Sequence, residues 1–295
     1  MITQFNNVSV RLDKKEILRH LDWSIEPGQV VGLLGKNGAG KSTLIRTLLG
    51  LIPVADGELK TLGIEPRSFS DEQKQDIAYV PQVAVGYEGF KVKTALKIHA
   101  SCYARWNQAL AERMLHKFDI ESSAQVDKLS TGQRQAFMLM LALASSPKFL
   151  VMDEPVASLD PAARRDVLQF VAEAAGGDTS ILYSTHITAD LNRLTDKVAM
   201  LAGGKICFYH STEALAQSVL IKGVPSERIQ ANKLWASNLL LASESQAIFC
   251  AWDTELEQQL HQYLGCTSML VQPLNLEELF IRWHRLNTAL YPSCD

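Results

Sequence analysis

Short apolar runs alternate with helical patterns along the first two thirds of the chain. Val30–Leu34 stops at a glycine, and a helical pattern follows over Ser42–Leu49. Phe149–Met152 and Ile181–Ser184 are further apolar runs of strand length. Strands that are buried on both faces have this composition. The pattern from residue 2 to about residue 200 therefore predicts a mostly parallel sheet covered by helices.

The pattern changes at two places along the chain. Between Val83 and Gln125 it becomes mainly helical, with a loop at Tyr87–Gly89, which predicts a helical insertion over about residues 83–145. After Gly203-Gly204 shorter strand and helix signals take over. We expect a large domain over residues 1–210 and a small α+β accessory domain over residues 211–295.

The accessory domain is predicted to hold two strands, each followed by a helix. The strands are expected at Gln246–Trp252 and Ser268–Gln272. Thr254 and Glu257 have the spacing of a capping box that opens a helix, and Gly265 ends it. Asn275 is placed to cap a last helix. Its apolar face consists of Leu276, Leu279, Phe280 and Trp283.

Composition narrows the class of protein. Hydrophobic residues make up 47% of the 295 residues and charged residues 21%, which is typical of a soluble globular protein. The net charge of −3 argues against a dedicated nucleic-acid binder, which carries a basic excess. The five cysteines are scattered without metal-ligand spacing, as expected of reduced thiols: Cys102, Cys207, Cys250, Cys266 and Cys294.

Neither a signal peptide nor a membrane span is predicted. The start, MITQFNNVSV, has no basic segment followed by an apolar one. The longest apolar candidate, Ala136–Ala144, is less than half of the ~20 residues that a membrane-spanning helix needs. We therefore expect any membrane role to depend on a partner.

The strongest local motif is a glycine-rich loop between a predicted strand and a predicted helix. It fits the pattern G-x-x-x-x-G-K-S/T and consists of Gly35, Lys36, Asn37, Gly38, Ala39, Gly40, Lys41 and Ser42. Backbone N–H groups can surround phosphate oxygens only where side chains do not intervene, which favours glycine. The helix that follows directs its positive end at the phosphates, and Lys41 adds a point charge. This loop predicts a nucleotide-phosphate site.

Two further segments carry chemistry, although each also has an ordinary structural explanation. Asp153-Glu154 ends an apolar strand, so one carboxylate could hold Mg²⁺ and the other polarise a water, or both could be exposed acids. Ser130 is a good helix N-cap in Leu129–Gln135, and a helix N-terminus can bind an anion. In isolation this second segment also fits an ordinary capped helix.

Six motifs in this order resemble the ATP-binding cassette (ABC) family. They are the phosphate loop, Gln82 after Tyr79-Val80-Pro81, the signature segment Leu129-Ser130-Thr131-Gly132-Gln133, Asp153-Glu154, Ser158-Leu159-Asp160, and His186 after Ser184-Thr185. The resemblance covers residues 1–210. It implies an α/β P-loop NTPase cassette with a mostly parallel sheet, an antiparallel β part and a helical insertion, here followed by the small α+β domain.

The resemblance also implies roles for single residues. Residues 35–43, which end at Thr43, would bind the phosphates of ATP. Ser42 and Gln82 would hold Mg²⁺, with Asp153 behind a water. Glu154 would be the general base, His186 would contact the γ-phosphate and hold Glu154, and Gln82 would begin a loop that senses a transmembrane partner. The residues expected to act on the nucleotide of a second cassette or at the dimer interface are Ser130, Gly132, Gln133 and Asp160.

The chain departs from the family pattern at two positions. Leu12 stands where the family usually has an aromatic residue that stacks on adenine, so selectivity for adenine is in doubt. Thr131 stands where glycine is commoner in the signature. Because its neighbours are the expected phosphate ligands, we expect this change to be tolerated.

The resemblance implies an ATPase subunit of a transporter. It would work as a homodimer or heterodimer of cassettes, head to tail, on an integral-membrane permease at the cytoplasmic face of the membrane, with ATP and Mg²⁺ as cofactors and no nucleic acid. The tail Leu274–Ile281 resembles cassettes of drug, antibiotic-peptide and polysaccharide exporters, which favours export. An importer ATPase is the alternative, followed by a soluble ABC protein acting on ribosomes or DNA. The transported substrate is not encoded here.

Overall fold

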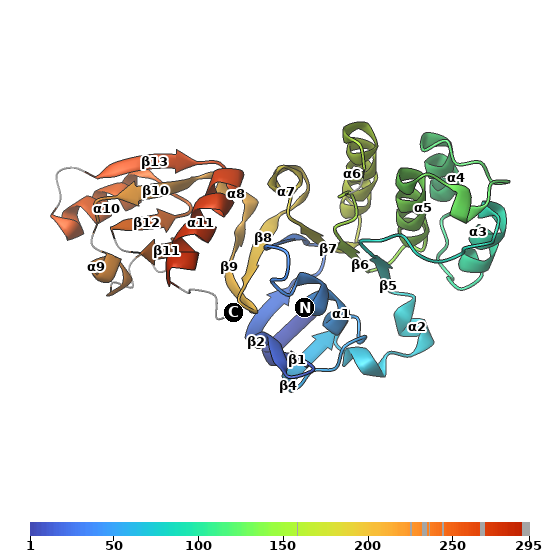
Figure 1. Cartoon of the computed structure of the whole chain (residues 1–295), viewed down its shortest axis with the longest axis horizontal. Coiled ribbons are helices and arrows are strands. Elements are labelled where there is room, and N and C mark those ends of the chain that lie inside the picture. The colour runs from blue at the N-terminus through green and yellow to red at the C-terminus, as the bar shows by residue number, and fades with distance from the viewer. Residues whose placement is uncertain are drawn as a thin grey trace. The chain divides into compact units, whose positions relative to one another are not determined.

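The structure is a computed structural model of the chain, shown in Figure 1. It describes residues 1–157, 159–224, 226–231, 235, 237–243, 245–265 and 269–290. Two compact units can be distinguished, one formed by residues 1–186 and 199–206 and the other by residues 187–198 and 207–295. The domain boundary expected near residue 210 stays a prediction. Ser158, named in one motif above, lies outside the described residues.

A six-stranded sheet, in the order β5-β6-β7-β3-β8-β9, lies mainly in the first unit, and parts of β8 and β9 fall in the residue ranges of the second. The pairs β5–β6, β6–β7 and β7–β3 are parallel, and every residue of β3, β6 and β7 is buried. Its strands are β3 (Val30–Leu34), β5 (Ile77–Val80), β6 (Phe149–Asp153), β7 (Ser180–Thr185), β8 (Lys197–Ala202) and β9 (Lys205–Ser211). The continuous apolar runs in the sequence therefore correctly predicted strands that are buried on both faces.

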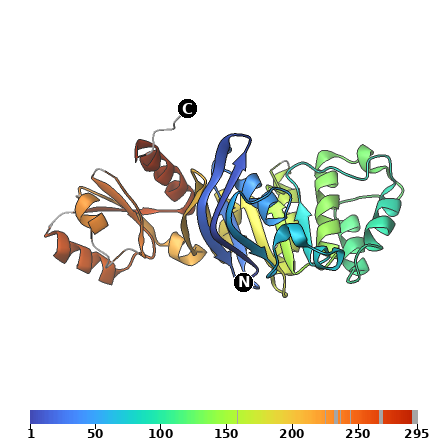
Figure 2. The same cartoon turned by 90° about the horizontal axis from the view of Figure 1, so that it is seen from below.

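A second sheet in this unit is antiparallel, as the fold class required. It contains β1 (Thr3–Leu12), β2 (Lys15–Ile25) and β4 (Asp56–Thr61) in the order β2-β1-β4. β1 and β2 form a hairpin whose turn contains Asp13 with a positive φ of 54°. Figures 1 and 2 show the three strands next to one another at the blue, N-terminal end of the chain.

Helices connect these strands. Three of them, α3, α4 and α5, occupy the segment expected as a helical insertion and lie together in Figure 1, with α4 packed on α5. The helical elements are α1 (Lys41–Leu48), η1 (Pro66–Ser68), α2 (Asp71–Lys74), α3 (Val92–Ala100), α4 (Gln108–Lys117), η2 (Val126–Lys128), α5 (Thr131–Ala144) and α6 (Pro161–Ala175).

The second unit has an α+β composition and a core of its own. Its four-stranded antiparallel sheet has the order β11-β12-β10-β13. Trp235, Phe249 and Leu260 are fully buried in one apolar cluster of this unit. Its elements are α7 (Thr188–Leu194), α8 (Thr212–Ala216), β10 (Ser218–Lys222), α9 (Ser226–Ala231), β11 (Leu239–Ser243), β12 (Gln246–Phe249), α10 (Thr254–Leu264), β13 (Leu270–Leu274) and α11 (Leu276–Leu290).

The helix ends of this unit test the cap predictions. Gly265 adopts φ 63° and ends α10 as predicted. The N-cap of α10 is Asp253, whose carboxylate accepts a hydrogen bond from the backbone N–H of Leu256 at 2.7 Å. The prediction of Thr254 as the N-cap was wrong. Asp253 directly precedes it, and its charged carboxylate accepts a hydrogen bond from a backbone N–H of the first helical turn that has no partner within the helix. Asn275 caps α11 as predicted, accepting the N–H of Glu278 at 2.8 Å.

Two of the four strands in the sheet of this unit, β12 and β13, lie close to where the patterns placed them, whereas β10 and β11 were not predicted. β12 begins at Gln246 as expected but ends at Phe249, before the predicted end at Trp252. β13 begins at Leu270, and the predicted start at Ser268 lies outside the described residues. No helix in the described part of the chain is both long enough and apolar enough to cross a membrane.

Candidate active site

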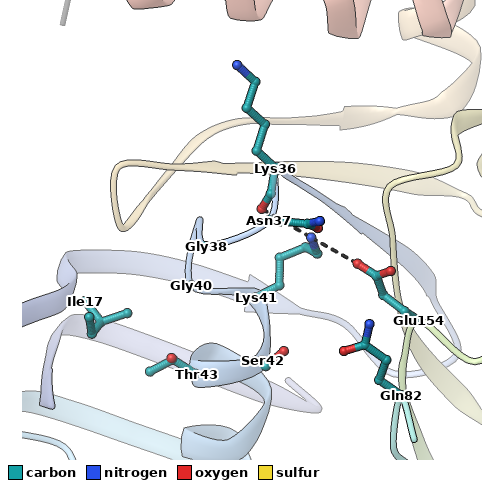
Figure 3. A pocket seen from close by; sticks show the side chains of 10 residues that line it. All are labelled: Ile17, Lys36, Asn37, Gly38, Gly40, Lys41, Ser42, Thr43, Gln82 and Glu154. Atoms are coloured by element: carbon teal, nitrogen blue, oxygen red, sulfur yellow. Dashed lines mark hydrogen bonds and ion pairs between the residues drawn. The ribbon is translucent and has the colours of Figure 1, made fainter. Parts of the chain in front are cut away.

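A cavity of about 450 Å³ opens at the carboxyl end of β3. The C-terminal edge of a parallel sheet is where α/β proteins place their sites, because each strand delivers the loop that follows it to the same edge. Figure 3 shows the lining side chains. They belong to Ile17, Lys36, Asn37, Gly38, Gly40, Lys41, Ser42, Thr43, Gln82 and Glu154.

The phosphate-loop glycines occupy backbone positions that other residues would strain. Gly38 has φ 80°, and Gly40, which is the N-cap of α1, has φ 104°. A Cβ atom on Gly35 would lie 2.6 Å from the carbonyl oxygen of Leu201, so the loop is held against β8. Left-handed backbone and close approach are both tolerated only by glycine. The loop therefore presents backbone N–H groups and the N-terminus of α1 to the cavity.

Lys41 is buried and already has partners. Its ammonium group donates to the carbonyl oxygens of Gly35 at 2.7 Å and Lys36 at 3.3 Å. It also forms an ion pair with Glu154, with 3.3 Å between Lys41 Nζ and Glu154 Oε1. Since both side chains are buried, the pair neutralises two charges that would be costly alone. An anion that binds in the cavity would compete with Glu154 for this ammonium group.

Glu154 follows the last residue of β6 and has a positive φ of 49°. Its backbone N–H donates to the carbonyl oxygen of Ser184 at 3.0 Å. Its second carboxylate oxygen, Oε2, lies 2.7 Å from Nδ1 of His186, which comes directly after β7. The carboxylate is thus fixed between a lysine from the loop after β3 and a histidine from the loop after β7.

Asp153 adds a second carboxylate to the site, and Gln82 adds a side-chain amide. Asp153 is buried in the last position of β6, where the Ser184 hydroxyl donates to its Oδ1 at 2.9 Å. Gln82 follows β5 and lines the cavity on the same side as Glu154 in Figure 3. Four neighbouring strands, β5, β6, β7 and β3, therefore each supply one part of the site.

The signature residues lie elsewhere. Ser130 is the N-cap of α5 in a capping box with Gln133, and neither residue lines the cavity. The Gln133 amide also donates to the carbonyl oxygen of Asp119 at 2.9 Å. A Cβ atom on Gly132 would lie 3.5 Å from the side chain of Leu159, so the start of α5 adjoins the segment before α6.

Asp160 is the N-cap of α6, which sequence reasoning did not anticipate. Its Oδ1 accepts the backbone N–H groups of Ala162 at 2.9 Å and Ala163 at 3.0 Å. Hydrogen bonds from Ala163 and Ala162 lower the pKa of its carboxyl group. The signal was present in Asp160-Pro161, since an acidic N-cap followed by proline is typical of a helix start.

Three other residues were missed as parts of the site. Ile17 lines the cavity, Ser184 holds Asp153, and the Gln135 amide donates to the carbonyl oxygen of Pro81 at 3.1 Å, next to Gln82. Ser184 and Gln135 lie within motif segments named in the sequence analysis. Their contacts depend on the register of the strands and on the packing of α5, which the sequence pattern does not show. Ile17 had no signal in the sequence.

Comparison with known proteins shows what this chain is similar to. A family model described as "ABC transporter" matches residues 18–157. The chain is 32% identical to the ABC-type transporter ATP-binding protein EcsA of Bacillus subtilis, over 65% of this chain and 80% of that protein. It is 28% identical to the Nod factor export ATP-binding protein I of Rhizobium etli, over 94% of this chain and 92% of that protein.

A solved structure agrees in fold. A structure described as the ATP-binding subunit of an ABC transporter matches with a TM-score of 0.66 and 27% identity, covering 72% of this chain and 90% of the other. The cassette fold expected from the motif order is therefore confirmed.

Proposed function

Because the chain belongs to the ABC transporter ATP-binding family, we propose that it hydrolyses ATP to drive export through a separate membrane subunit. One observation carries this proposal. The phosphate loop, Gln82 and Glu154 converge on one cavity, and His186 is hydrogen-bonded to Glu154. A site that only bound a nucleotide, without hydrolysing it, would not need a buried carboxylate held beside the phosphate loop.

The chain's own groups can perform each part of the hydrolysis. Backbone N–H groups of the loop and the N-terminus of α1 bind the phosphates, and Lys41 turns from Glu154 to the β- and γ-oxygens. Glu154, released from Lys41, accepts a proton from the attacking water. His186 keeps the carboxylate in place through its bond of 2.7 Å. A fixed base contributes typically about 10²–10⁴-fold to the rate of such a step.

The oxygen donors at the site fit Mg²⁺. Ser42, Gln82 and Asp153 offer a hydroxyl, an amide carbonyl and a carboxylate, the ligand types that this cation prefers. Within the described residues no group of three or more His, Cys, Asp or Glu side chains could hold a metal alone. The remaining ligands would come from nucleotide phosphates and water, as is usual for Mg²⁺. The cation would neutralise charge on the phosphates.

We propose that a second cassette completes the site. Ser130 and Gly132 at the start of α5 do not line the cavity of their own chain, yet a helix N-terminus with a hydroxyl N-cap is suited to bind an anion. Two chains arranged head to tail would place each α5 N-terminus and Asp160 at the nucleotide of the other. Loss of the γ-phosphate would then weaken the interface.

The membrane partner is proposed to dock beside Gln82. Val83, Val85 and Phe90 follow it in sequence and are 67%, 59% and 44% exposed. Exposed apolar residues that gather in one segment indicate an interaction surface. Export is the favoured direction, since a relative named for Nod factor export matches along nearly the whole length of both chains.

The proposal is tested with Glu154→Gln, which keeps the shape of the side chain but cannot accept a proton. Hydrolysis should fall at least about 100-fold. The tagged variant is then recovered from detergent-solubilised membranes with and without ATP and Mg²⁺, and its partners are identified by mass spectrometry. A polytopic membrane protein at a fixed ratio is expected. In a variant that carries both Glu154→Gln and Lys41→Ala, the amount of partner recovered should be the same with and without ATP.

Two other results would change the assignment. Recovery with ribosomal proteins or nucleic acid, and without a membrane protein, would reject the transporter role. Uptake of a substrate in the inward direction by the reconstituted complex would replace export by import.

A further inference from the structure

We infer that Gln135 is a positioning residue for Gln82, the proposed amide ligand of Mg²⁺. Its side chain fixes the peptide unit that joins Pro81 to Gln82. The inference rests on the proposed function, because it concerns the same cavity. It is carried by one buried hydrogen bond between two elements that are far apart in the sequence.

Gln135 is a polar residue in an apolar part of the molecule. It is 3% exposed and lies in α5, where Ala136, Phe137 and Leu139 are also buried. Burial of an amide costs free energy unless its polar atoms find hydrogen-bond partners. Gln135 Nε2 donates to the carbonyl oxygen of Pro81 at 3.1 Å. An apolar side chain of this size would be buried without that cost, so the hydrogen bond is what requires an amide.

A fixed carbonyl group at Pro81 also orients Gln82. The carbonyl of one residue and the N–H of the next belong to one planar peptide unit. The ring of Pro81 restricts its own φ to about −65°. Because Pro81 comes directly after β5, the strand, the ring and the Gln135 amide together set the direction in which the chain leaves the sheet. Gln82 lines the cavity from this point, and Figure 3 shows its side chain turned towards the phosphate loop.

A second contact from α5 reaches the other end of the segment that follows Gln82. Arg134 directly precedes Gln135, and its Nη2 lies 3.9 Å from Oε1 of Glu88. The same carboxylate oxygen accepts the backbone N–H of Gly86 at 2.8 Å. The Arg134–Glu88 pair is partly exposed, and such pairs contribute little to stability. The buried amide of Gln135 is therefore the contact that should hold the beginning of the segment.

This hydrogen bond should matter more for the metal site than for the fold. Mg²⁺ binds in a nearly ideal octahedral geometry, so it tolerates little displacement of a ligand. A ligand that occupies the required position only part of the time binds more weakly by that fraction. Loss of a hydrogen bond behind a metal ligand weakens binding by about 10–100-fold. We expect the lower end of this range here, because Ser42 and Asp153 would remain in place.

The first measurement uses Gln135→Met, which keeps an unbranched side chain but removes the donor. In the nucleotide-free chain without Mg²⁺, hydrogen exchange followed by mass spectrometry should become faster over residues 82–88. In the Glu154→Gln background, the Mg²⁺ concentration that half-saturates ATP binding should rise about tenfold. Affinity for ATP at saturating Mg²⁺ should stay within about threefold of the parent, because the phosphate loop is unchanged.

Ser145→Ala is the matched control, because it removes another buried hydrogen bond at the opposite end of α5. Ser145 is the C-cap of this helix and is 1% exposed, and its hydroxyl donates to the carbonyl oxygen of Ala142 at 2.8 Å. This variant should leave both the exchange over residues 82–88 and the Mg²⁺ requirement unchanged. Gln135→Asn is a second test variant in case Gln135→Met does not fold. Its amide is shorter by one methylene group and no longer reaches Pro81, so the same shift is expected.

A double-mutant cycle tests whether Gln135 acts through Gln82. Gln82→Ala alone should raise the Mg²⁺ requirement by about tenfold or more. Adding Gln135→Met to Gln82→Ala should then raise it further by less than about twofold, because the ligand that Gln135 positions is already absent. Independent effects that multiply in the double variant would overturn the inference. An unchanged Mg²⁺ requirement in both Gln135 variants would overturn it as well.

The outcomes separate this inference from the proposed function. A shifted Mg²⁺ requirement for binding, without hydrolysis by the parent chain, would support the inference and contradict the ATPase role. Hydrolysis by the parent chain, with equal Mg²⁺ requirements in the parent and the Gln135 variants, would overturn the inference and leave the ATPase role intact. Failure of the parent and of Glu154→Gln to bind ATP at any Mg²⁺ concentration would overturn both.

Discussion

At the scale of single residues, two neighbouring carboxylates have different surroundings. Asp153 is buried in the last position of β6 and is held by the Ser184 hydroxyl. Glu154 leaves the strand with φ 49°, a conformation that costs about 1–3 kcal/mol and persists only where surrounding contacts hold it. Lys41 and His186 supply those contacts. The backbone conformation of Glu154 thus directs its carboxylate between Lys41 and His186, where it is proposed to act as the general base.

The hydrogen bond from Ser184 to Asp153 should control the affinity for Mg²⁺. Ser184→Ala removes the donor that orients a buried carboxylate, and loss of such a supporting bond weakens metal binding by about 10–100-fold. We expect the Mg²⁺ concentration needed for tight ATP binding to rise by about tenfold, measured by titrating Mg²⁺ against nucleotide binding to Glu154→Gln.

Ser180→Ala is the matched control for this change. Ser180 lies on the same strand, is buried and accepts the backbone N–H of Gly28 at 2.8 Å. It should lower stability by about 1 kcal/mol without altering the Mg²⁺ requirement. The same shift in both variants would mean that β7 as a whole, and not Asp153, sets the metal affinity.

At the scale of elements, α5 is connected to the segment that follows Gln82. Gln135 of α5 donates to the carbonyl oxygen of Pro81 at 3.1 Å, and Arg134 pairs with Glu88 at 3.9 Å. Tyr87 in this segment is hydrogen-bonded to His99 of α3 at 2.8 Å. A displacement near Gln82 would therefore reach α5, whose N-cap is Ser130. Because helices move as rigid units, such contacts can link a docking surface to a phosphate site.

The N-terminus of α5 should matter for both stability and hydrolysis. Ser130→Ala removes the N-cap hydroxyl and should cost about 1 kcal/mol of stability. Ser70→Ala removes the equivalent hydroxyl from the capping box of α2, with a similar cost. Only Ser130→Ala should also lower the ATPase rate, by about tenfold or more, because α5 is proposed to contact a nucleotide and α2 is not. Equal rates in the two variants would contradict the proposed role of Ser130.

His99 should make this region sensitive to acid. Burial lowers the pKa of its imidazole below the ordinary value of 6.5, so the unfolded chain binds the proton more readily than the folded one. Its contribution to stability is complete above about pH 6.5 and is lost as the pH falls towards the lower folded value. The aromatic neighbours Tyr87, Tyr103 and Trp106 carry no charge in this range.

The measurement compares chemical unfolding of the parent chain and His99→Gln between about pH 7.5 and 5.5. The parent should lose more stability on acidification than the variant, since glutamine does not titrate. Burial also lowers the pKa of His210, but that group is common to both proteins and cancels in the comparison. Parallel pH profiles would show that His99 does not titrate differently in the folded state.

Element types were easier to predict than the contacts between elements. The buried strands and the phosphate loop have strong local patterns, and the fold follows from their order. The cap of α10 was misplaced by one residue because Asp253 and Thr254 are both good N-caps, and only the backbone geometry distinguishes them. In the β1–β2 hairpin Val10 pairs with Leu18 and Arg11 with Glu16, which leaves Ile17 without an opposite residue. This irregularity, and the bond between Ser184 and Asp153, depend on how neighbouring strands pair, which the pattern of a single strand does not give.

At the scale of the whole molecule, the second unit has its own apolar core, and the residues that line the cavity all belong to the first unit. Stability need not be uniform along such a chain, and a unit can open locally without loss of the rest. We therefore expect damage to the core of the second unit to spare ATP hydrolysis by the isolated chain.

Leu260→Ala and Leu44→Ala form a matched pair for this test. Both leucines are fully buried in helices, one in α10 and one in α1, directly after the phosphate loop. Each truncation should lower the free energy of unfolding of the unit that contains it by about 2–5 kcal/mol. Hydrogen exchange followed by mass spectrometry should show faster exchange in the second unit for Leu260→Ala, with an ATPase rate within about twofold of the parent. Leu44→Ala should increase exchange around α1 and lower the rate, because α1 carries Ser42. If Leu260→Ala instead abolished hydrolysis while the first unit kept its protection, the second unit would have to act on the catalytic site, and the cassette would not be an independent ATPase.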